Sequence, residues 1–258
     1  MSIIFPARQV DELLRIALAS IGAQTFRDFE LVAVCPAAIH TDMRRLAGEA
    51  GIDTLTLVDD PRRGLAAALN AALALSRAPL AARMDADDVC EPGRLQAQWL
   101  AFEADGQLTV LGSSAVLIDG TGAVVGQRSV PTDTLVSLND MLFSNPLVHP
   151  SVMFRTQAIA QLGGYDAALL AEDYDLWIRA AASGARIKIV AAPLLRYRIH
   201  GAQISYRVTG MKSCAQIAST IRRFALAKAP LRACLATCAW LLRGAALAVW
   251  ARLRKARE

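Results

Sequence analysis

The chain has few of the residue types that build disulfide-rich or zinc-binding scaffolds. It has only three histidines, and aromatic residues make up 6% of it. Its five cysteines, an odd number with no Cys-x-x-Cys pair, are Cys35, Cys90, Cys214, Cys234 and Cys238. This pattern fits neither a disulfide framework nor a zinc knuckle, so we expect a reducing compartment. The first residues also lack a basic segment followed by a long apolar run, so no signal peptide is expected.

Acidic residues are almost absent from the last fifth of the chain. Residues 207–258 hold eleven Lys or Arg and one acid, whereas residues 1–206 carry a formal charge of −5 within the total of +5. An apolar fraction of 54% allows a sizeable core. We therefore predict an acidic soluble domain over 1–206 and a basic amphipathic helical tail over 207–258. Such a tail indicates an anionic surface as partner, either phospholipid or nucleic acid.

Short apolar runs alternate with helical patterns up to residue 84. Strands are predicted at 2–5, 29–35, 54–58 and 79–84, and helices at 10–22, 41–50 (capped by Thr41) and 64–76. This alternation is typical of an α/β fold with a mostly parallel central sheet flanked by helices. Such sheets bind ligands beyond the carboxyl ends of their strands, and Asp85 follows a strand at that end.

The pattern after Asp88 is mixed. Helices are predicted at 92–103 and 172–183, strands at 108–118, 123–127, 151–155, 186–190 and 195–199, and a hairpin turn at 119–122. Gly184 is a candidate C-cap of the second of these helices. We expect this half to complete the site that the first half begins.

The acidic cluster Asp85-Ala86-Asp87-Asp88 is the main chemical signal. Three carboxylates within four residues repel one another unless a cation neutralises them. Mg²⁺ and Mn²⁺ prefer oxygen ligands and are commonly shared between carboxylates and substrate phosphates. The cluster is therefore suited to hold a metal ion together with a diphosphate. The metal would also stabilise the charge that develops on a departing nucleotide diphosphate. A solvated acidic turn, with Asp88 as an N-cap, is the alternative, and this motif alone does not decide between the two.

Eight segments follow one another along the chain: SIIFP (2–6), AQTFRDFELV (23–32), GLAAALN (64–70), MDADD (84–88), NPLVHPSVMFR (145–155), GGYD (163–166), EDYDLWIR (172–179) and YRIH (197–200). Together and in this order they resemble the family 2 glycosyltransferases, which are inverting enzymes of the GT-A fold. The resemblance covers roughly residues 2–205. The segment with His-Pro and the late Tyr-Arg-Ile-His is similar to bacterial surface-polysaccharide transferases.

The resemblance implies a donor site and a divalent cation, Mn²⁺ or Mg²⁺. Asp85 and Asp87 would hold the metal-bound diphosphate, with Asp88 supporting them and His200 as a further metal ligand or a structural residue. The donor-binding residues so predicted are Pro6, Ala7, Arg8, Arg63, Asn70, Arg83, Asp85, Ala86 and Asp87. For Arg63 and Arg83 the alternative is a surface or structural role without a ligand.

The Glu-Asp pair at 172–173 is the candidate catalytic group. The resemblance implies that Asp173 is the general base that inverting transfer requires on the acceptor hydroxyl. Both carboxylates begin a predicted helix, whose dipole favours their ionised form, so a charge-complementary first turn is the alternative. His149, Glu172 and Trp177 are predicted on the acceptor side. His149 is alternatively a loop cap, and Trp177 a core residue.

One part of the family pattern is missing. Val34-Cys35-Pro36 stands where the family has an Asp pair, one of which reads the nucleobase, and Ala7-Arg8-Gln9 replaces an aromatic residue and Asn. Base recognition is therefore altered or supplied by backbone groups, and the identity of the nucleotide stays open. The metal and base motifs are intact.

The tail is apolar from Leu231 to Val249 but is interrupted by Arg232 and Arg243. A central Arg is costly in a spanning helix. Because Arg232, Arg243 and Arg254 are eleven residues apart, they share one stripe of a helix. We therefore predict an interfacial helix on anionic lipid, with a core-packing or dimerisation helix as the alternative.

Taken together, the patterns predict an inverting, metal-dependent glycosyltransferase. It would move a sugar from a nucleotide-diphosphate-sugar to a hydroxyl of a lipid-linked or growing glycan in cell-surface polysaccharide synthesis. We expect it in the cytoplasm, peripheral on the inner membrane face, with no nucleic-acid partner. The alternatives are a nucleotidyltransferase of similar fold, although Pro6-Ala7-Arg8-Gln9 has no Gly to grip a triphosphate, and a non-catalytic scaffold at the membrane.

Overall fold

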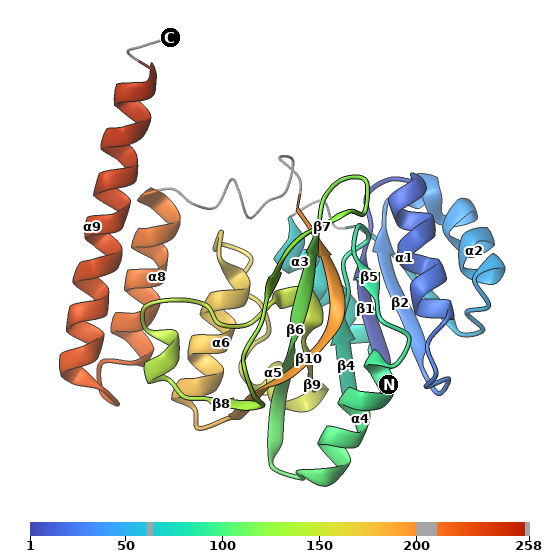
Figure 1. The fold of residues 1–258 in the computed structure, drawn as a ribbon, viewed down its shortest axis with the longest axis horizontal. Coiled ribbons are helices and arrows are strands. Elements are labelled where there is room, and N and C mark those ends of the chain that lie inside the picture. The colour runs from blue at the N-terminus through green and yellow to red at the C-terminus, as the bar shows by residue number, and fades with distance from the viewer. Residues whose placement is uncertain (61–63, 200–210, 256–258) are drawn as a thin grey trace. The chain divides into compact units, whose positions relative to one another are not determined.

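The computed structural model describes residues 1–60, 64–199 and 211–255, with side chains up to Val249. Its contacts divide the chain into two compact units (Figure 1). The first contains Met1–Leu135, Leu147–Gly164 and Arg186–Ile199, and the second contains Val136–Pro146, Tyr165–Ala185 and His200–Glu258. The contacts thus group Val136–Pro146 and Tyr165–Ala185 with the tail. The domain boundary at residue 206 stays a prediction.

The first unit is built on a mixed sheet with the strand order β3-β2-β1-β4-β9-β6-β10-β5. The strands are β1 (Ser2–Pro6), β2 (Glu30–Cys35), β3 (Leu55–Asp59), β4 (Leu80–Arg83), β5 (Val89–Cys90), β6 (Leu108–Ile118), β7 (Val124–Arg128), β8 (Thr134–Val136), β9 (Met153–Arg155) and β10 (Arg186–Arg198). The first four are parallel to one another, β9 runs antiparallel to β4 and β6, and β10 runs parallel to β6. The carboxyl ends of β1 to β4 therefore meet at one edge.

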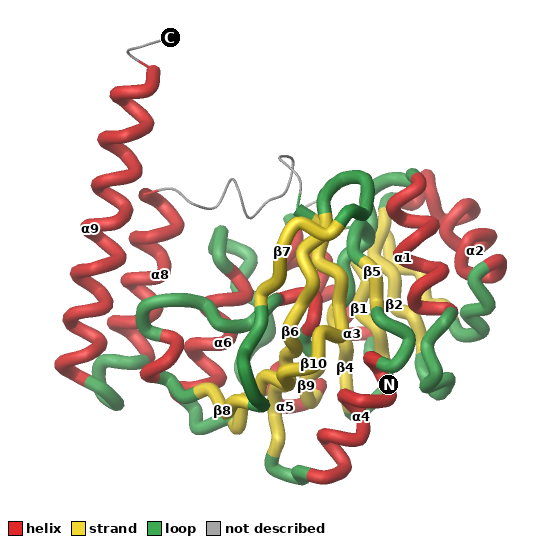
Figure 2. The backbone as a smooth tube through the Cα atoms, viewed as in Figure 1, coloured by secondary structure: helices red, strands yellow, loops and turns green. Residues whose placement is uncertain are grey.

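Helices cover both faces of β1 and β2. The helical elements of this unit are α1 (Glu12–Gly22), η1 (Ala37–Ile39), α2 (His40–Glu49), α3 (Leu65–Leu75), α4 (Arg94–Ala104), η3 (His149–Ser151) and α5 (Thr156–Gln161). Ile3 and Phe5 join one buried cluster with Leu14 of α1 and Leu95 of α4. Ile4 points to the opposite face and is also fully buried, and α3 packs against β1 and β2. Figure 2 draws these strands as a yellow layer beside α1 and α2.

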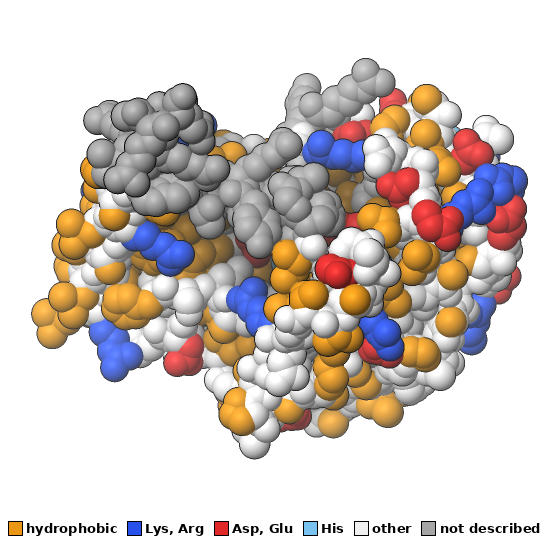
Figure 3. Space-filling model, turned by 45° about the horizontal axis from the view of Figure 1, so that its top comes forward, with side chains coloured by type: hydrophobic (Ala, Val, Ile, Leu, Met, Phe, Trp, Pro, Cys, Tyr) orange, Lys and Arg blue, Asp and Glu red, His pale blue; other side chains and the backbone are white. Residues whose placement is uncertain are grey.

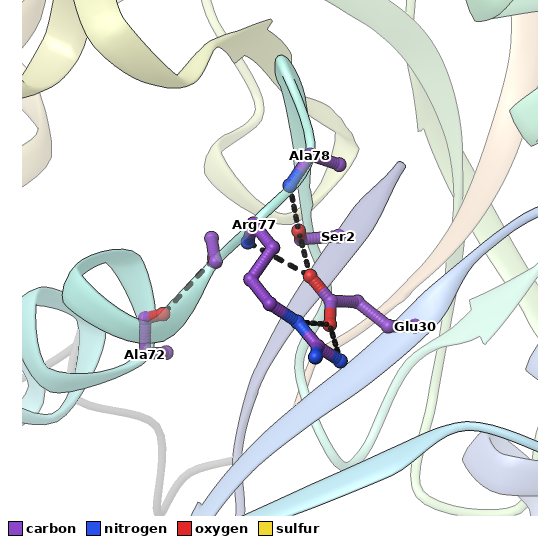
Figure 4. Close-up of polar contacts among 6 residues, drawn as sticks. Ser2, Glu30, Ala72, Arg77 and Ala78 are labelled. Atoms are coloured by element: carbon purple, nitrogen blue, oxygen red, sulfur yellow. Dashed lines mark hydrogen bonds and ion pairs between the residues drawn. The ribbon is translucent and has the colours of Figure 1, made fainter.

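A polar network ties α3 to the amino ends of the strands, opposite the predicted site (Figure 4). Glu30 is buried and accepts hydrogen bonds from Ser2 Oγ (2.7 Å) and Arg77 N (2.9 Å) through Oε1. Its Oε2 accepts from Arg77 Nε over 3.0 Å, and Ser2 Oγ accepts from Ala78 N over 3.2 Å. The network satisfies a carboxylate that would be costly to bury alone.

The second unit consists of helices around the tail. They are η2 (Asn139–Met141), α6 (Glu172–Ala182), α8 (Met211–Phe224) and α9 (Pro230–Lys255). Trp240 of α9 meets the Tyr174 ring edge-on at 5.8 Å and donates from Nε1 to Leu142 O over 2.9 Å. Thr220 of α8 donates to Asp175 Oδ1 over 2.8 Å. The tail is therefore packed onto the helix that carries Asp173.

Helix α9 combines close packing with an apolar outer face. At Gly244 an added Cβ would lie 3.1 Å from Cys214 Cβ, so the small residue permits close approach to α8. By length and composition, Pro230–Val249 could cross a membrane, and 17% of its most apolar window is buried. The interfacial helix stays a prediction, because the length and composition of Pro230–Val249 are compatible with it as well as with a helix that crosses a membrane.

The predicted elements agree with the structure except in three places. Residues 186–190 and 195–199 were predicted as two strands, but β10 is continuous because register shifts around Pro193 absorb its missing N–H. Helix α2 begins at His40 after η1, and Thr41 does not cap it. The strand predicted at 151–155 begins only at Met153, because Ser151 ends η3. The hairpin turn is confirmed: Gly122 N donates to Asp119 O over 3.1 Å, and Gly122 has φ +90°.

Candidate functional site

The acidic cluster lies directly after β4, at the carboxyl edge of the parallel strands. Asp85, Asp87 and Asp88 each offer a carboxylate oxygen, and these atoms lie within 4.8 Å of one another. Met84 N still donates to Ile4 O over 3.2 Å, so the backbone is held to the sheet up to the residue before the cluster. The sequence prediction that the strand delivers Asp85 at its end is confirmed.

Asp88 is the buried member of the cluster, with no exposed surface. Its Oδ1 accepts a hydrogen bond from Arg198 N over 2.7 Å. Its Oδ2 is buried and has no hydrogen-bond partner among the described residues. Burial, together with the charges of Asp85 and Asp87, raises the pKa of Asp88 well above its usual range. A cation bound between these groups would supply the missing partner.

Two buried arginines balance the charge of the cluster. Arg83, the last residue of β4, is 2% exposed and forms an ion pair with Asp85. Arg198, the last residue of β10, is also 2% exposed and donates from Nε to Asp87 O over 2.7 Å. Arg83 was predicted as a phosphate contact, and its buried pair with Asp85 supports the structural alternative. No separate role was predicted for Arg198, which was named only within the Tyr-Arg-Ile-His motif at 197–200.

The other predicted donor residues lie on neighbouring elements of the first unit. Pro6 ends β1, and Ala7 is buried and donates from N to Val34 O over 2.9 Å, whereas Arg8 is exposed. Asn70 lies on α3 and approaches Gly164 so closely that an added Cβ there would meet Asn70 Oδ1 at 2.5 Å. Ala86 is partly exposed between the two carboxylates. Arg63 lies outside the described residues.

Asp59 ends β3 and Asp60 follows it, beside the position where the expected Asp pair is missing. Asp59 pairs in register with Cys35 of β2, and its Oδ1 accepts a hydrogen bond from Ala37 N over 2.9 Å. The N–H of Asp60 donates to Cys35 O over 3.1 Å. Burial and these two carboxylates raise the pKa of the Cys35 thiol to about 11. The sequence reasoning missed this acidic neighbourhood because it searched only the end of β2.

His149 lies in η3, which packs against β4, β6 and β10 of the first unit. Burial and the charge of Arg83 lower the pKa of His149 well below its ordinary value. The imidazole is therefore neutral at pH 7. The predicted metal ligand His200 lies outside the described residues.

In the second unit, Asp173 lies in the first turn of α6, which has no side-chain cap. Asn145 Nδ2 donates to Asp173 Oδ2 over 2.9 Å, and Asp173 is partly exposed. Glu172 is buried, and Trp177 has no exposed surface, as expected of a core residue. The contact of Asn145 with Asp173 was not expected from the sequence, although Asn145 begins one of the motifs that carry the family resemblance.

The cluster fits a hard divalent cation by its donor chemistry. Its potential ligands are all carboxylate oxygens, and one buried oxygen of Asp88 lacks a partner among the described residues. Mg²⁺ and Mn²⁺ accept such ligands and leave room for phosphate oxygens. The first unit therefore contains a group of side chains that could hold a metal-diphosphate.

Comparisons with known proteins agree with this arrangement. The O-antigen biosynthesis glycosyltransferase WbnJ of Escherichia coli is 29% identical over 83% of this chain and 85% of its own length. The amylovoran biosynthesis glycosyltransferase AmsE of Erwinia amylovora is 28% identical over 78% of this chain and 76% of its own.

Two proteins of known structure share the fold of this chain. A 1–349 structure of Staphylococcus aureus TarS in complex with UDP-GlcNAc matches 85% of this chain and 66% of its own, with a TM-score of 0.68 and 18% identity. The chain spans 39% of a longer TarS structure. The mannosyltransferase PcManGT of Pyrobaculum calidifontis, in complex with GDP-Man and Mn²⁺, matches 98% of this chain and 74% of its own, with a TM-score of 0.62 and 20% identity.

These likenesses establish the GT-A fold, an α/β fold with a mixed central sheet flanked by helices. The family model for "Glycosyl transferase family 2" matches residues 2–159, which contain most of the first unit and the whole acidic cluster. With eight motifs in the family's order and a matching fold, the chain belongs to glycosyltransferase family 2 and is a glycosyltransferase.

Proposed function

We propose that this glycosyltransferase uses a nucleotide-diphosphate-sugar as its donor and holds the diphosphate through a divalent cation at Asp85 and Asp87. The observation that carries this proposal is the group of three carboxylates within 4.8 Å at the carboxyl end of β4. When bound, the cation would stabilise the charge on the departing nucleotide diphosphate. Asp88, whose Oδ2 has no partner among the described residues, is a third candidate ligand.

Asp173 is proposed as the general base that removes the proton from the acceptor hydroxyl. It is partly exposed, and Asn145 Nδ2 donates to its Oδ2 over 2.9 Å, which orients the carboxylate. The amino end of α6 favours its ionised form, which is the form that a base requires. The expected result is inversion at the anomeric carbon.

The proposed acceptor is a hydroxyl of a lipid-linked or growing glycan in cell-surface polysaccharide synthesis. The names of WbnJ and AmsE, which refer to O-antigen and amylovoran biosynthesis, support this class. PcManGT is solved with Mn²⁺ and GDP-Man and TarS with UDP-GlcNAc, so nucleotide-sugars with either base are candidate donors.

We place the enzyme on the cytoplasmic membrane face through the outer side of α9. Leu231, Leu235 and Leu242 are 81%, 65% and 70% exposed and recur at helical spacing. Figure 3 shows apolar and basic side chains next to one another on the surface of the tail helices, at the left of the view. Because residues 207–258 hold eleven basic residues and one acid, self-association of this face would bring like charges together, whereas anionic lipid would neutralise them.

The donor proposal is tested by assaying the purified full chain with a panel of nucleotide-sugars, with Mn²⁺ and with EDTA. Release of nucleoside diphosphate that depends on Mn²⁺ supports it. Equal release in EDTA would refute metal dependence, and no release or transfer from any donor would refute the donor class. Asp173→Asn should release less product while it still binds the donor.

The membrane proposal is tested by flotation with vesicles of phosphatidylcholine alone and with added phosphatidylglycerol. The variant Leu235→Glu with Leu242→Glu should stop flotation with the anionic vesicles. Leu100→Glu, an exposed leucine of α4 in the first unit, serves as the matched control. If both variants float equally, the proposed face is wrong. A concentration-dependent dimer that the double substitution dissociates, without any flotation, would favour the dimerisation alternative.

A further inference from the structure

Arg198 joins two loops of the first unit that are far apart in the sequence. Its guanidinium donates from Nε to Asp87 O over 2.7 Å, and from Nη1 to Asp119 O over 2.7 Å and to Gly120 O over 3.3 Å. Its backbone N–H donates to Asp88 Oδ1 over 2.7 Å. One residue therefore holds a carbonyl and a carboxylate of the acidic cluster, and at the same time the turn between β6 and β7.

The contact requires an arginine. Arg198 is 2% exposed, and a buried cation is tolerated only when its donors are satisfied. Its planar guanidinium has five donors, which can reach carbonyls in separate loops. A lysine ammonium is a compact point charge and cannot span the same acceptors. The residue type is therefore set by geometry as well as by charge.

The turn at the other side of Arg198 is well ordered by its own hydrogen bonds. Asp119 N donates to Ala123 O over 2.9 Å, and Asp119 Oδ1 accepts from Thr121 N over 2.8 Å. Ile199 N donates to Ile118 O over 2.8 Å, which fixes the residue after Arg198 to the base of the hairpin. The carbonyls that Arg198 contacts at 119 and 120 are thus a stable support.

We propose that Arg198 is a positioning residue that sets the affinity of the Asp85–Asp88 cluster for its divalent cation. It would do so by tying the 85–88 turn to the ordered turn at 119–122, so that the carboxylates are held ready for the cation. The inference rests on the proposed metal-diphosphate function. Partners of metal ligands typically change metal affinity by roughly 10- to 100-fold when they are removed. Because Arg198 acts through the backbone of Asp87, the effect should appear in metal binding and much less in kcat at saturating metal.

The test compares Arg198→Met and Arg198→Lys with Arg155→Met. Arg155 is a matched control because it also donates to two backbone carbonyls, Leu108 O (2.7 Å) and Gly106 O (2.9 Å), but pairs with Leu80 at the amino end of β4. The Kd of Mn²⁺ is measured with GDP and, separately, with UDP present. Both Arg198 variants should weaken Mn²⁺ binding by roughly 10- to 100-fold, with kcat restored at high Mn²⁺. A change no larger than that of Arg155→Met would overturn the inference.

A measurement without ligand separates this inference from the proposed function. Hydrogen exchange of amides 84–90 and 118–124 should become faster in Arg198→Met and stay as in the parent in Arg155→Met. If the parent binds neither Mn²⁺-nucleotide, the proposed function fails, and exchange alone then decides whether Arg198 holds the loop. Unchanged protection at 84–90 would overturn the inference. If Arg198→Met does not fold, Arg198→Lys, which keeps the charge, supplies the same comparison.

Discussion

In the first unit, the buried Asp88 and the partly exposed Asp85 and Asp87 lie beside two buried arginines, whereas in the second unit Asp173 is partly exposed and accepts a hydrogen bond from the Asn145 amide. A site for a metal-diphosphate must keep several like charges close together, and this requires opposite charge around them. A base must reach the proton of an exchanging acceptor, and this requires exposure and one fixed orientation. The two arrangements suit these two tasks.

The difference means that damage to one unit should leave the task of the other intact. The Arg83–Asp85 ion pair and the hydrogen bonds from Arg198 to Asp87 and Asp88 lie within the first unit, and the Asn145–Asp173 contact lies within the second. Donor binding and proton removal should therefore be separable by substitution. The predictions below test that separation, from the largest expected effect to the smallest.

The largest effect is expected for Asp173→Asn. Loss of a general base typically lowers the rate by 10²- to 10⁴-fold, and we expect roughly that loss of sugar transfer. The Kd of the Mn²⁺-nucleotide should stay as in the parent, because the first unit is untouched. Asn145→Ala, which removes the hydrogen bond to Asp173 but leaves the carboxylate, should give a smaller loss. Transfer by Asp173→Asn at the parental rate would show that the base is another residue.

The next effect is expected for Trp240→Ala. The change removes a ring that contacts Tyr174 and an N–H that donates to Leu142 O, and truncation of a large aromatic core residue costs about 3–5 kcal/mol. Thermal unfolding followed by hydrogen exchange should show early opening of the second unit only. Trp240→Phe keeps an aromatic ring but loses the N–H that donates to Leu142 O, and should lose about 1 kcal/mol. Equal opening of β1 and β4 would contradict the independence of the two units.

A smaller effect is expected for Asp88→Asn, which should stabilise the metal-free protein, whereas most substitutions of buried residues destabilise the fold. Burial raises the pKa of Asp88, so the folded state holds its proton more tightly than the unfolded state does. The parent should therefore lose stability as the pH rises from the unfolded pKa through the folded one. At neutral pH the neutral amide should stabilise the metal-free protein by about 1 kcal/mol or more, yet it should abolish the gain in Tm on adding Mn²⁺ with nucleotide. A destabilised metal-free variant at neutral pH would contradict this account of Asp88.

The smallest effect is expected for Glu30→Gln, which lies at the amino end of β2 and so at the edge of the sheet opposite the acidic cluster. Burial opposes ionisation of Glu30, but hydrogen bonds from Ser2 and Arg77 prevail and lower its pKa. The ionised form therefore stabilises the fold above the unfolded pKa, and this contribution is lost as the pH falls through the folded pKa. At pH 7 the variant should lose about 1–2 kcal/mol. The difference in unfolding free energy between parent and variant should shrink below about pH 4, and a constant difference would refute the linkage.

Local pattern predicted most of the elements and the location of the acidic cluster. The alternation of strands and helices up to Asp85 was enough to place Asp85 and Asp87 at a strand end, and the Asp-Gly-Thr-Gly turn was recognised from its residues. Helix α8 was not separated from the tail, although Cys214, Ile217, Ala218 and Ile221 have helical spacing and are buried.

The contacts of Arg198 and Asn145 could not be predicted, because they depend on tertiary approach. Arg198 reaches Asp87 across 111 positions and Asp119 across 79, and Asn145 reaches Asp173 across 28. No periodicity encodes such distances. The same holds for Asp59 and Asp60, which come next to Cys35 only because β3 pairs with β2.

The central claim is that Asp85 and Asp87 hold a divalent cation together with a nucleoside diphosphate. Calorimetric titration of the full chain with UDP and with GDP, each with Mn²⁺ and with EDTA, tests it most directly. We predict binding of at least one nucleotide that requires Mn²⁺ and is lost in Asp87→Asn, while Asp173→Asn binds as the parent does. Nucleotide binding that is equally tight in EDTA, or that survives Asp87→Asn, would contradict the claim.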